Sequence, residues 1–221
     1  MELKPHFFAF DILESNIHHL YHSLYRSSSS IYRLVQNEIM FKGIYNPKTD
    51  SIIDSENKKE FESFQDILRN LNNFIYFNSL LLGSYSIFEV AFKEICKFVE
   101  EYSNPQKEFN QPNRLILKSC RKYLTDSTFV NFSGKEIDSK YIKLLKIGDV
   151  RNLFAHENGN IMQDKTRNLE EQQNYNLVKS IKELTILKNG QIYINNEDFI
   201  EHFIQESESF IKLIIKQLKE K

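Results

Sequence analysis

Apolar side chains recur at steps of three, four and seven residues through two long stretches of this 221-residue chain, residues 12–34 and 61–99. That spacing places apolar groups on one face of an α-helix, whereas a half-buried strand alternates with a period of two. The chain is therefore expected to fold around two long amphipathic helices. The apolar positions are Leu13, Ile17, Leu20, Leu24, Ile31 and Leu34 in the first stretch, and Phe61, Phe64, Leu68, Leu71, Ile75, Leu82, Tyr85, Phe88, Phe92, Ile95 and Val99 in the second.

Both long stretches contain residues that are poor helix formers. The second stretch is longer than most globular helices, so a break or kink is predicted near Asn72 and Asn73, with one very long helix as the alternative. It should end at Asn104, because Pro105 disfavours helix in the preceding residue. In the first stretch, the serine run 27–30 indicates either a bend or a close helix crossing.

Shorter elements are expected in the C-terminal half. Helices are predicted over roughly residues 113–124, 138–157, 172–181 and 198–219. Asn189 and Gly190 lie between two short β-prone runs, which is a strong hairpin signal. The predicted fold is all-α, a bundle of about five to seven helices with one small β-hairpin near the C-terminus, in a single domain of residues 1–221.

The last helix carries both a start signal and a core pattern. Asn196, Glu197 and Asp198 are expected to cap it. The predicted buried positions are Phe199, Phe203, Phe210, Ile214 and Leu218.

The charge balance excludes a globally basic nucleic-acid binder, because 29 Lys and Arg residues face 30 Asp and Glu residues, for a formal net charge of −1. Any affinity for RNA must come from a local patch. Two such sets are present, and a solvated helix face is the alternative for each. They are Arg114, Lys118, Arg121 and Lys122 on the short helix, and Lys140, Lys143 and Lys146 at three-residue steps.

Cysteine usage and hydropathy indicate the compartment. Cys96 and Cys120 lie far apart in the sequence and form no CxxC or Cys/His ligand pattern, which points to structural thiols in a reducing compartment. No basic cluster followed by a long apolar run opens the chain, and no eighteen apolar residues follow one another. A cytoplasmic protein without a membrane partner is expected.

Between Gly148 and Gly159, polar side chains that could bind a ligand or take part in catalysis interrupt the apolar pattern. Arg151 carries donors suited to a phosphate, and His156 can act as acid or base near neutral pH. Asn152 and His156 are four residues apart and share a helix face, which Arg151 can reach from its edge. A second copy of the helix, packed alongside, would tighten this cluster, so a homodimer is expected.

The two glycines that flank this motif have different expected effects. Gly148 costs about 1 kcal/mol relative to alanine inside a helix, so a start near Asp149, or a kink just before Arg151, is an alternative to a continuous helix over 138–157. Gly159 is well placed as the left-handed residue that ends the helix.

The string Leu-Leu-Lys-Ile-Gly-Asp-Val-Arg-Asn-Leu-Phe-Ala-His, residues 144–156, resembles the signature of the HEPN superfamily, whose members are all-helical and often act as metal-independent endoribonucleases. The resemblance extends to residues 83–89, Gly-Ser-Tyr-Ser-Ile-Phe-Glu, where members often carry small residues followed by an acidic one near the catalytic arginine. It implies catalytic roles for Arg151, Asn152, His156 and Glu89, and no cofactor. Asn158 stands where some family toxins carry a modified tyrosine, which argues against that subgroup.

The resemblance also implies a mechanism and a biological setting. RNA supplies its own nucleophile, the 2′-hydroxyl, so His156 would move protons, Arg151 would stabilise the transition state, Asn152 would orient the phosphate or the imidazole, and Glu89 would hold Arg151. The expected products carry 2′,3′-cyclic phosphate and 5′-hydroxyl ends. The family association further implies a toxin or antiviral defence effector that an antitoxin or regulatory protein keeps silent.

Less specific interpretations remain open. Arg151 could simply pair with Asp149 or Glu89, while His156 stabilises its own helix C-terminus. The protein would then be a non-catalytic dimerisation module, or one that binds a nucleotide or a protein. Glu14, His18 and His22, with His19 beside them, could serve a metal hydrolase, but metal sites in bundles draw ligands from at least two helices, so no metal is predicted.

Overall fold

The computed structural model describes residues 7–42, 45–46, 51–52, 58–103, 108–110, 115–128 and 130–220. The protein is an all-α bundle with one small hairpin near the C-terminus, as predicted. The elements in chain order are α1 (Phe7–Lys42), β1 (Tyr45–Asn46), β2 (Ser51–Ile52), α2 (Lys58–Ser103), α3 (Ile116–Ser127), α4 (Lys135–Glu157), the 3₁₀ helix η2 (Leu169–Glu171), α5 (Tyr175–Lys179), β3 (Leu184–Ile186), β4 (Ile192–Ile194) and α6 (Asp198–Lys219).

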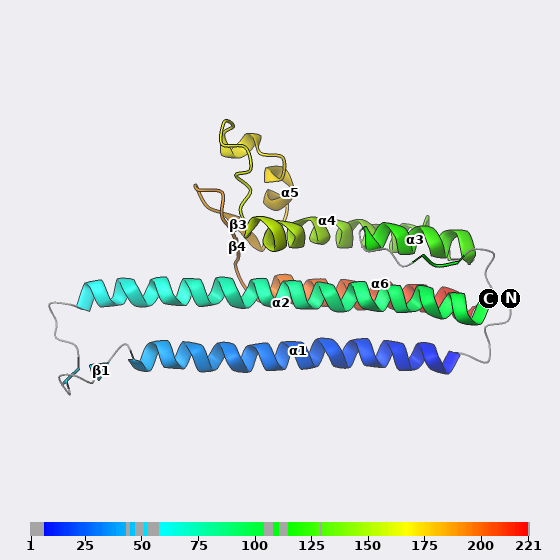
Figure 1. Ribbon diagram of the computed structural model, residues 1–221, viewed down its shortest axis with the longest axis horizontal. Helices are drawn as coiled ribbons and strands as arrows, with labels where there is room; N and C mark the ends of the chain where they lie inside the picture. Colours follow the sequence, from blue (N-terminus) through cyan, green and yellow to red (C-terminus); the bar gives the residue numbers. More distant parts are fainter. Residues whose placement is uncertain are drawn as a thin grey trace.

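Helix α2 is the central element of the bundle, in contact with α1, α3, α4 and α6. It runs antiparallel to α1, with α3 and α4 along its other side and α6 behind it (Figure 1). The hairpin of β3 and β4 and helix α5 lie together at the C-terminal end of α4 (Figure 1). A second, two-residue ladder pairs Tyr45 with Ile52 and Asn46 with Ser51 at the α1–α2 connection.

The predicted break near Asn72 and Asn73 is wrong, because α2 is one helix of 46 residues. Asparagine weakens helices when its side chain bonds to nearby backbone. Here the Asn73 side chain is engaged by α1 instead, since its Oδ1 accepts hydrogen bonds from Tyr32 Oη at 2.5 Å and Gln36 Nε2 at 3.2 Å. The helix ends at Ser103, one residue before the predicted boundary.

The serine run 27–30 lies within a continuous α1 and takes part in its contact with α2. Ser29 Oγ and Tyr76 Oη are hydrogen-bonded at 3.0 Å. One turn away the two helices also come close, because a Cβ placed on Gly83 would lie 3.0 Å from a Leu24 methyl group. Small side chains at this crossing allow the helices to approach.

The core consists of two adjoining groups of buried apolar residues. The larger one fills the bundle around Phe88, Phe92, Phe203 and Phe210, which are fully buried. The smaller one lies where the hairpin packs on α2, α4 and α6. All five predicted core positions of α6 are buried: Phe199, Phe203, Phe210, Ile214 and Leu218.

Three local predictions for the C-terminal half need correction. Helix α4 begins at Lys135 and passes through Gly148 without interruption. The region predicted as one helix over 172–181 holds only the short α5, because the buried Gln172 side chain donates to the carbonyls of Asp164 and Arg167 and closes a loop. No side-chain capping bond forms at the start of α6.

Glu197, expected to cap α6, has a different role. Its carboxylate accepts hydrogen bonds from Tyr25 and from Tyr76, the latter at 3.2 Å. It therefore ties the start of α6 to α1 and α2. The hairpin prediction is confirmed, with Gly190 at φ 80° in the turn between β3 and β4.

Among the described residues, one helical segment, Asn70–Glu101 of α2, is long and apolar enough to cross a membrane by length and composition. Within its most apolar window, 44% is buried inside the protein. This part of α2 supplies both core groups, including Leu80, Leu81, Phe88 and Phe92.

We expect Gly148→Ala to destabilise the protein. A Cβ at this position would lie 2.2 Å from Tyr85 Oη, and the Tyr85 ring cannot move aside easily because it stacks on Phe203 at 5.4 Å. Overpacking of this kind costs about 1–3 kcal/mol, and the higher helix propensity of alanine offsets about 1 kcal/mol of it. Urea denaturation measures the net loss.

Ser139→Ala is the matched control, because Ser139 is exposed on the same helix and should change the unfolding free energy by less than about 0.5 kcal/mol. A Gly148→Ala protein as stable as the wild type would contradict a tight contact between Tyr85 and α4.

Candidate functional site

The C-terminal end of α4 presents the conspicuous polar motif. The helix ends at Glu157 because Asn158 and Gly159 both adopt left-handed backbone, at φ 52° and 70°. The Gly159 N–H donates to the Leu153 carbonyl at 2.9 Å, and a side chain at 159 would collide with the Phe154 ring. His156 is thereby held in the last helical turn.

Arg151 lies half-buried between α4 and α2, with 23% of its side chain exposed. Its guanidinium carbon lies 5.6 Å from the centre of the Tyr85 ring, and its Nη1 donates to Asn152 Oδ1 at 3.1 Å. Its Nη2 lies 3.9 Å from Glu89 Oε2, an ion pair longer than a hydrogen bond. Its Nε is buried and has no hydrogen-bond partner among the described residues.

Most of the hydrogen-bond donors of Arg151 are not used within the protein. A guanidinium has five N–H groups, and a planar phosphate-binding fork needs two of them on one side. In this protein Asn152 takes one and Glu89 is too distant to hydrogen-bond. Arg151 therefore keeps capacity for an anionic ligand at the surface.

Tyr85 and Gly148 position Arg151, although the sequence marks Tyr85 only as an apolar position of the long helix. The absence of a side chain at Gly148 lets the Tyr85 hydroxyl lie against the α4 backbone, and the ring then supports the guanidinium. Burial raises the pKa of Tyr85, and Glu89 raises it further while Arg151 lowers it, so the hydroxyl stays protonated. The usable sequence signal was Gly148, which was considered only as a weak point of the helix.

Glu89 is partly shielded from water, with 20% of its side chain exposed. Burial raises the pKa of this carboxyl, and the positive charges of Arg151 and Lys93 offset only part of the effect. The expected contact between Glu89 and Arg151 is present, but at ion-pair distance. Lys93, on the same helix, is a further neighbour that the motif search did not include.

His156 is not joined to this cluster within one chain. Five helical residues separate it from Arg151, which places the two side chains about 140° apart around the helix axis. The imidazole is exposed and makes no hydrogen bond or ion pair with any residue that the structure describes. One chain thus brings together Arg151, Asn152 and Glu89, whereas His156 shares a helix face with Asn152 but lies on a different side of α4 from Arg151.

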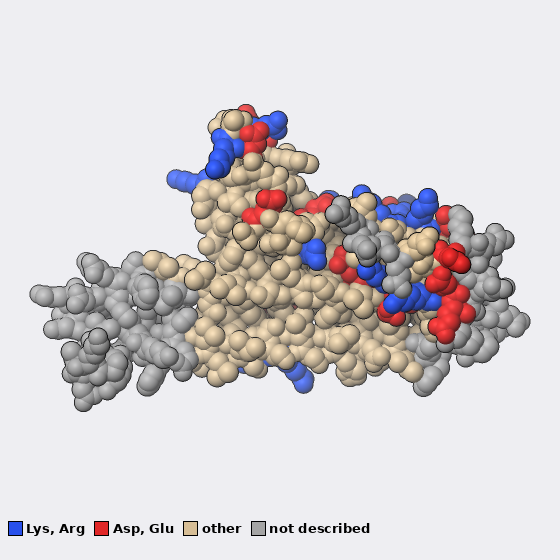
Figure 2. Space-filling model, viewed as in Figure 1, with Lys and Arg blue, Asp and Glu red and all other residues tan. Residues whose placement is uncertain are grey.

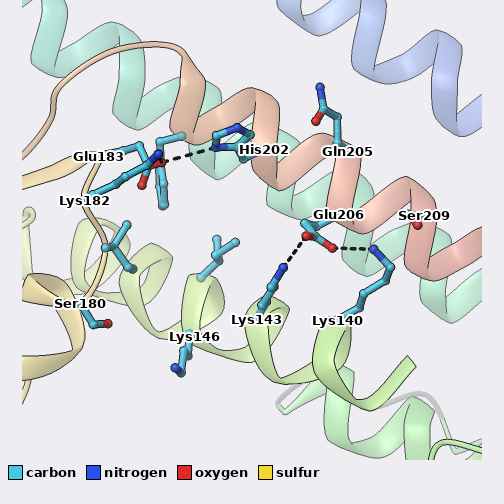
Figure 3. Close-up of a pocket in the computed structure, with 13 residues that line it drawn as sticks. Lys140, Lys143, Lys146, Ser180, Lys182, Glu183, His202, Gln205, Glu206 and Ser209 are labelled. Carbon is cyan, nitrogen blue, oxygen red and sulfur yellow. Dashed lines mark hydrogen bonds and ion pairs between the residues drawn. The ribbon is translucent and has the colours of Figure 1, made fainter. Parts of the chain in front are cut away.

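Two of the three lysines that precede the motif reach α6. Glu206 accepts hydrogen bonds from Lys140 Nζ at 2.8 Å and from Lys143 Nζ at 2.7 Å, while Lys146 is exposed (Figure 3). All three line a pocket between α4 and α6. The lysines therefore do not form one free basic stripe.

The basic set on α3 is also divided. Arg121 Nη2 pairs with Asp138 Oδ1 at 3.2 Å, and its guanidinium lies over the Tyr141 ring at 4.3 Å, which holds α3 to α4. Lys118 and Lys122 are exposed, and Arg114 lies outside the described residues. Figure 2 shows charged side chains over the region of α3 and α4, whereas the described surface over α1 and α2 is almost free of them.

The histidine face of α1 is paired rather than open. His18 Nδ1 lies 3.0 Å from Glu208 Oε1, and Glu14 lies 3.6 Å from Lys212 Nζ. The rings of His18 and His22 meet edge to face at 4.9 Å. Within the described part of the chain, no group of three or more His, Cys, Asp or Glu residues is placed to hold a metal ion.

Comparison of the chain with models of protein families, with curated proteins and with solved structures gave no match. The resemblance to HEPN proteins therefore rests on the residues of α2 and α4 alone.

We expect Glu89→Gln to change how stability depends on pH. Because the folded protein raises the pKa of Glu89, it binds this proton more tightly than the unfolded chain does. An unfolded glutamate has a pKa of about 4.3. In the wild type, the contribution of Glu89 to the unfolding free energy therefore falls as the pH rises from that value through the raised pKa of the folded protein. Glutamine cannot titrate, so the variant should gain stability relative to the wild type across that window.

Urea denaturation at a series of pH values measures this difference. Glu94→Gln is the control, since Glu94 is on the same helix, is 44% exposed and pairs with Lys97. A difference between the Glu89 variant and the wild type that does not change with pH would contradict the raised pKa.

Proposed function

We propose that this protein is a metal-independent endoribonuclease whose active site is completed at the interface of a homodimer. The observation that carries the proposal is the unsatisfied guanidinium of Arg151 beside Asn152 and Glu89, on the same helix end as an exposed imidazole. The resemblance of residues 144–156 and 83–89 to HEPN proteins supports the same conclusion.

The chemistry requires few groups, because RNA contains its own nucleophile. The 2′-hydroxyl oxygen attacks the adjacent phosphorus while its proton passes to a base, and the 5′-oxygen leaves with a proton from an acid. His156 is the proton-transfer group, and Arg151 stabilises the negative charge on the phosphorane. The products are a 2′,3′-cyclic phosphate and a 5′-hydroxyl.

A second chain is needed because one chain presents the two groups on different sides of α4. In a dimer, His156 of one subunit can approach the phosphate that Arg151 of the other subunit binds. An uncharged surface adjoins Glu89, since residues 70–88 contain no Asp, Glu, Lys or Arg and Val90 is 56% exposed. Such a surface favours contact with another copy of the chain.

The HEPN resemblance extends the proposal to a biological role. An RNA-cleaving protein of this type would act as a toxin or antiviral defence effector, and an antitoxin or regulatory partner would hold it inactive. Covering Arg151 or His156 would be sufficient for such inhibition.

A non-catalytic module for dimerisation, or for binding a nucleotide or protein, is the second candidate. The specific observation in its favour is that Arg151 already contacts Glu89 and Asn152, while His156 lies on a different side of α4 from Arg151. Under this alternative the motif serves to hold α4 on α2.

Cleavage of single-stranded RNA in EDTA tests the assignment. We expect Arg151→Ala and His156→Ala each to lower the cleavage rate at least about 100-fold, because each removes one chemical function from the transition state. Cleaved 5′ ends should accept phosphate from polynucleotide kinase without prior dephosphorylation. Arg167→Ala and His19→Ala, which alter exposed residues elsewhere, should retain the wild-type rate.

Equal cleavage by the wild type and both motif variants would remove the catalytic assignment and leave the non-catalytic module. Activity that is lost in EDTA and restored by a divalent ion would instead favour a metal hydrolase.

Mixing the two inactive variants tests the shared site. If Arg151 and His156 act across the interface, each mixed dimer contains one intact pair. An equimolar mixture should then recover up to about a quarter of the wild-type rate, because half of the dimers are mixed and each has one of two sites. If both groups act from the same chain, the mixture stays as inactive as its components.

A further inference from the structure

A hollow lies on the side of α4 that faces α6 (Figure 3). Its volume is about 770 Å³, within the range of small-molecule sites. Three parts of the chain form its walls: residues 140–147 of α4, residues 199–209 of α6 and the connection 180–183 before β3.

Cations and carboxylates alternate along these walls. Glu206 accepts hydrogen bonds from both Lys140 and Lys143, at 2.8 and 2.7 Å. Glu183 lies 3.6 Å from Lys182 Nζ and 3.5 Å from His202 Nδ1. Four lysines and two glutamates line the pocket, so it has an excess of positive charge before any ionisation of histidine.

The lining of the pocket is not only charged. Ile147, Ile181 and Phe199 supply apolar surface, while Ser180 and Ser209 add hydroxyl groups. Apolar lining together with several cationic donors suits an organic molecule that carries phosphate groups.

The Glu206 carboxylate lies where an anion would have to bind. Burial alone would raise its pKa, but the hydrogen bonds from Lys140 and Lys143 outweigh that effect and lower it, so Glu206 is charged. Each lysine ammonium has three donors and uses one on Glu206. The remaining donors are available to a ligand, which Glu206 repels and the lysines attract.

We propose that this pocket binds a small phosphorylated organic molecule, whose phosphate oxygens share or replace Glu206 as the partners of Lys140 and Lys143. An extended RNA backbone fits less well, because it would pass two carboxylates that are already engaged with the pocket's cations. This site is separate from Arg151 and His156, so it does not depend on the proposed ribonuclease activity.

Isothermal titration calorimetry on the full chain tests the proposal, with adenosine diphosphate as the probe and with adenosine and inorganic pyrophosphate as separate arms. We expect the diphosphate to bind and adenosine to bind poorly. Lys143→Met should weaken binding about tenfold or more, because it removes one charged donor from a 57% exposed side chain. If inorganic pyrophosphate binds, but more weakly than adenosine diphosphate, the adenosine part contacts the apolar lining of the pocket.

Glu206→Gln provides the sharpest distinction from a purely structural ion pair. It removes the charge that repels the ligand and frees both lysines, so binding should tighten several-fold. A structural role for these residues alone predicts no binding in either protein. Lys118→Met, at an exposed lysine on α3, is the matched control and should leave binding unchanged.

Three results would overturn the proposal. The first is the absence of adenosine diphosphate binding to both the wild type and Glu206→Gln at millimolar concentration. The second is adenosine diphosphate binding that Lys143→Met does not weaken. The third is Lys143-dependent binding of an RNA oligonucleotide by a protein that does not bind adenosine diphosphate. Arg151→Ala should bind the diphosphate normally, which separates this outcome from failure of the ribonuclease proposal.

Discussion

The contact of Tyr85 with Gly148 determines how α4 lies on α2, and the candidate site depends on that placement. The tyrosine hydroxyl occupies the space that a side chain at 148 would need. The same ring lies beneath the Arg151 guanidinium and packs on Phe203 of α6. One aromatic residue of α2 therefore joins three helices and orients the arginine.

The charged side chains of α4 fall into two groups that differ in how fully they are satisfied. Lys140 and Lys143 make hydrogen bonds shorter than 3 Å to Glu206, so they hold α4 to α6. Arg151 has a 3.9 Å ion pair and a buried Nε without a described partner. A partly desolvated cation with incomplete pairing interacts strongly with an incoming anion, because little water screens it.

Much of the bundle was predictable, and three of the errors involve polar side chains. Periodicity identified both long helices and the five buried positions of α6, and Asn189 and Gly190 identified the hairpin. The break at Asn73, the helix at Gln172 and the cap at Glu197 were wrong. At each of these positions a polar side chain bonds to a distant segment or closes a loop in the fold.

The sequence by itself determined the helical class, the site's residue types and the end of α4 at Asn158 and Gly159, because these follow from local spacing and backbone preference. Only the tertiary structure decided that Glu89 meets Arg151 at ion-pair distance and that Cys96 lies 3.9 Å from the Cys120 carbonyl. Such contacts depend on the rotation and crossing of packed helices, which many side chains set together. No short segment of sequence contains that information.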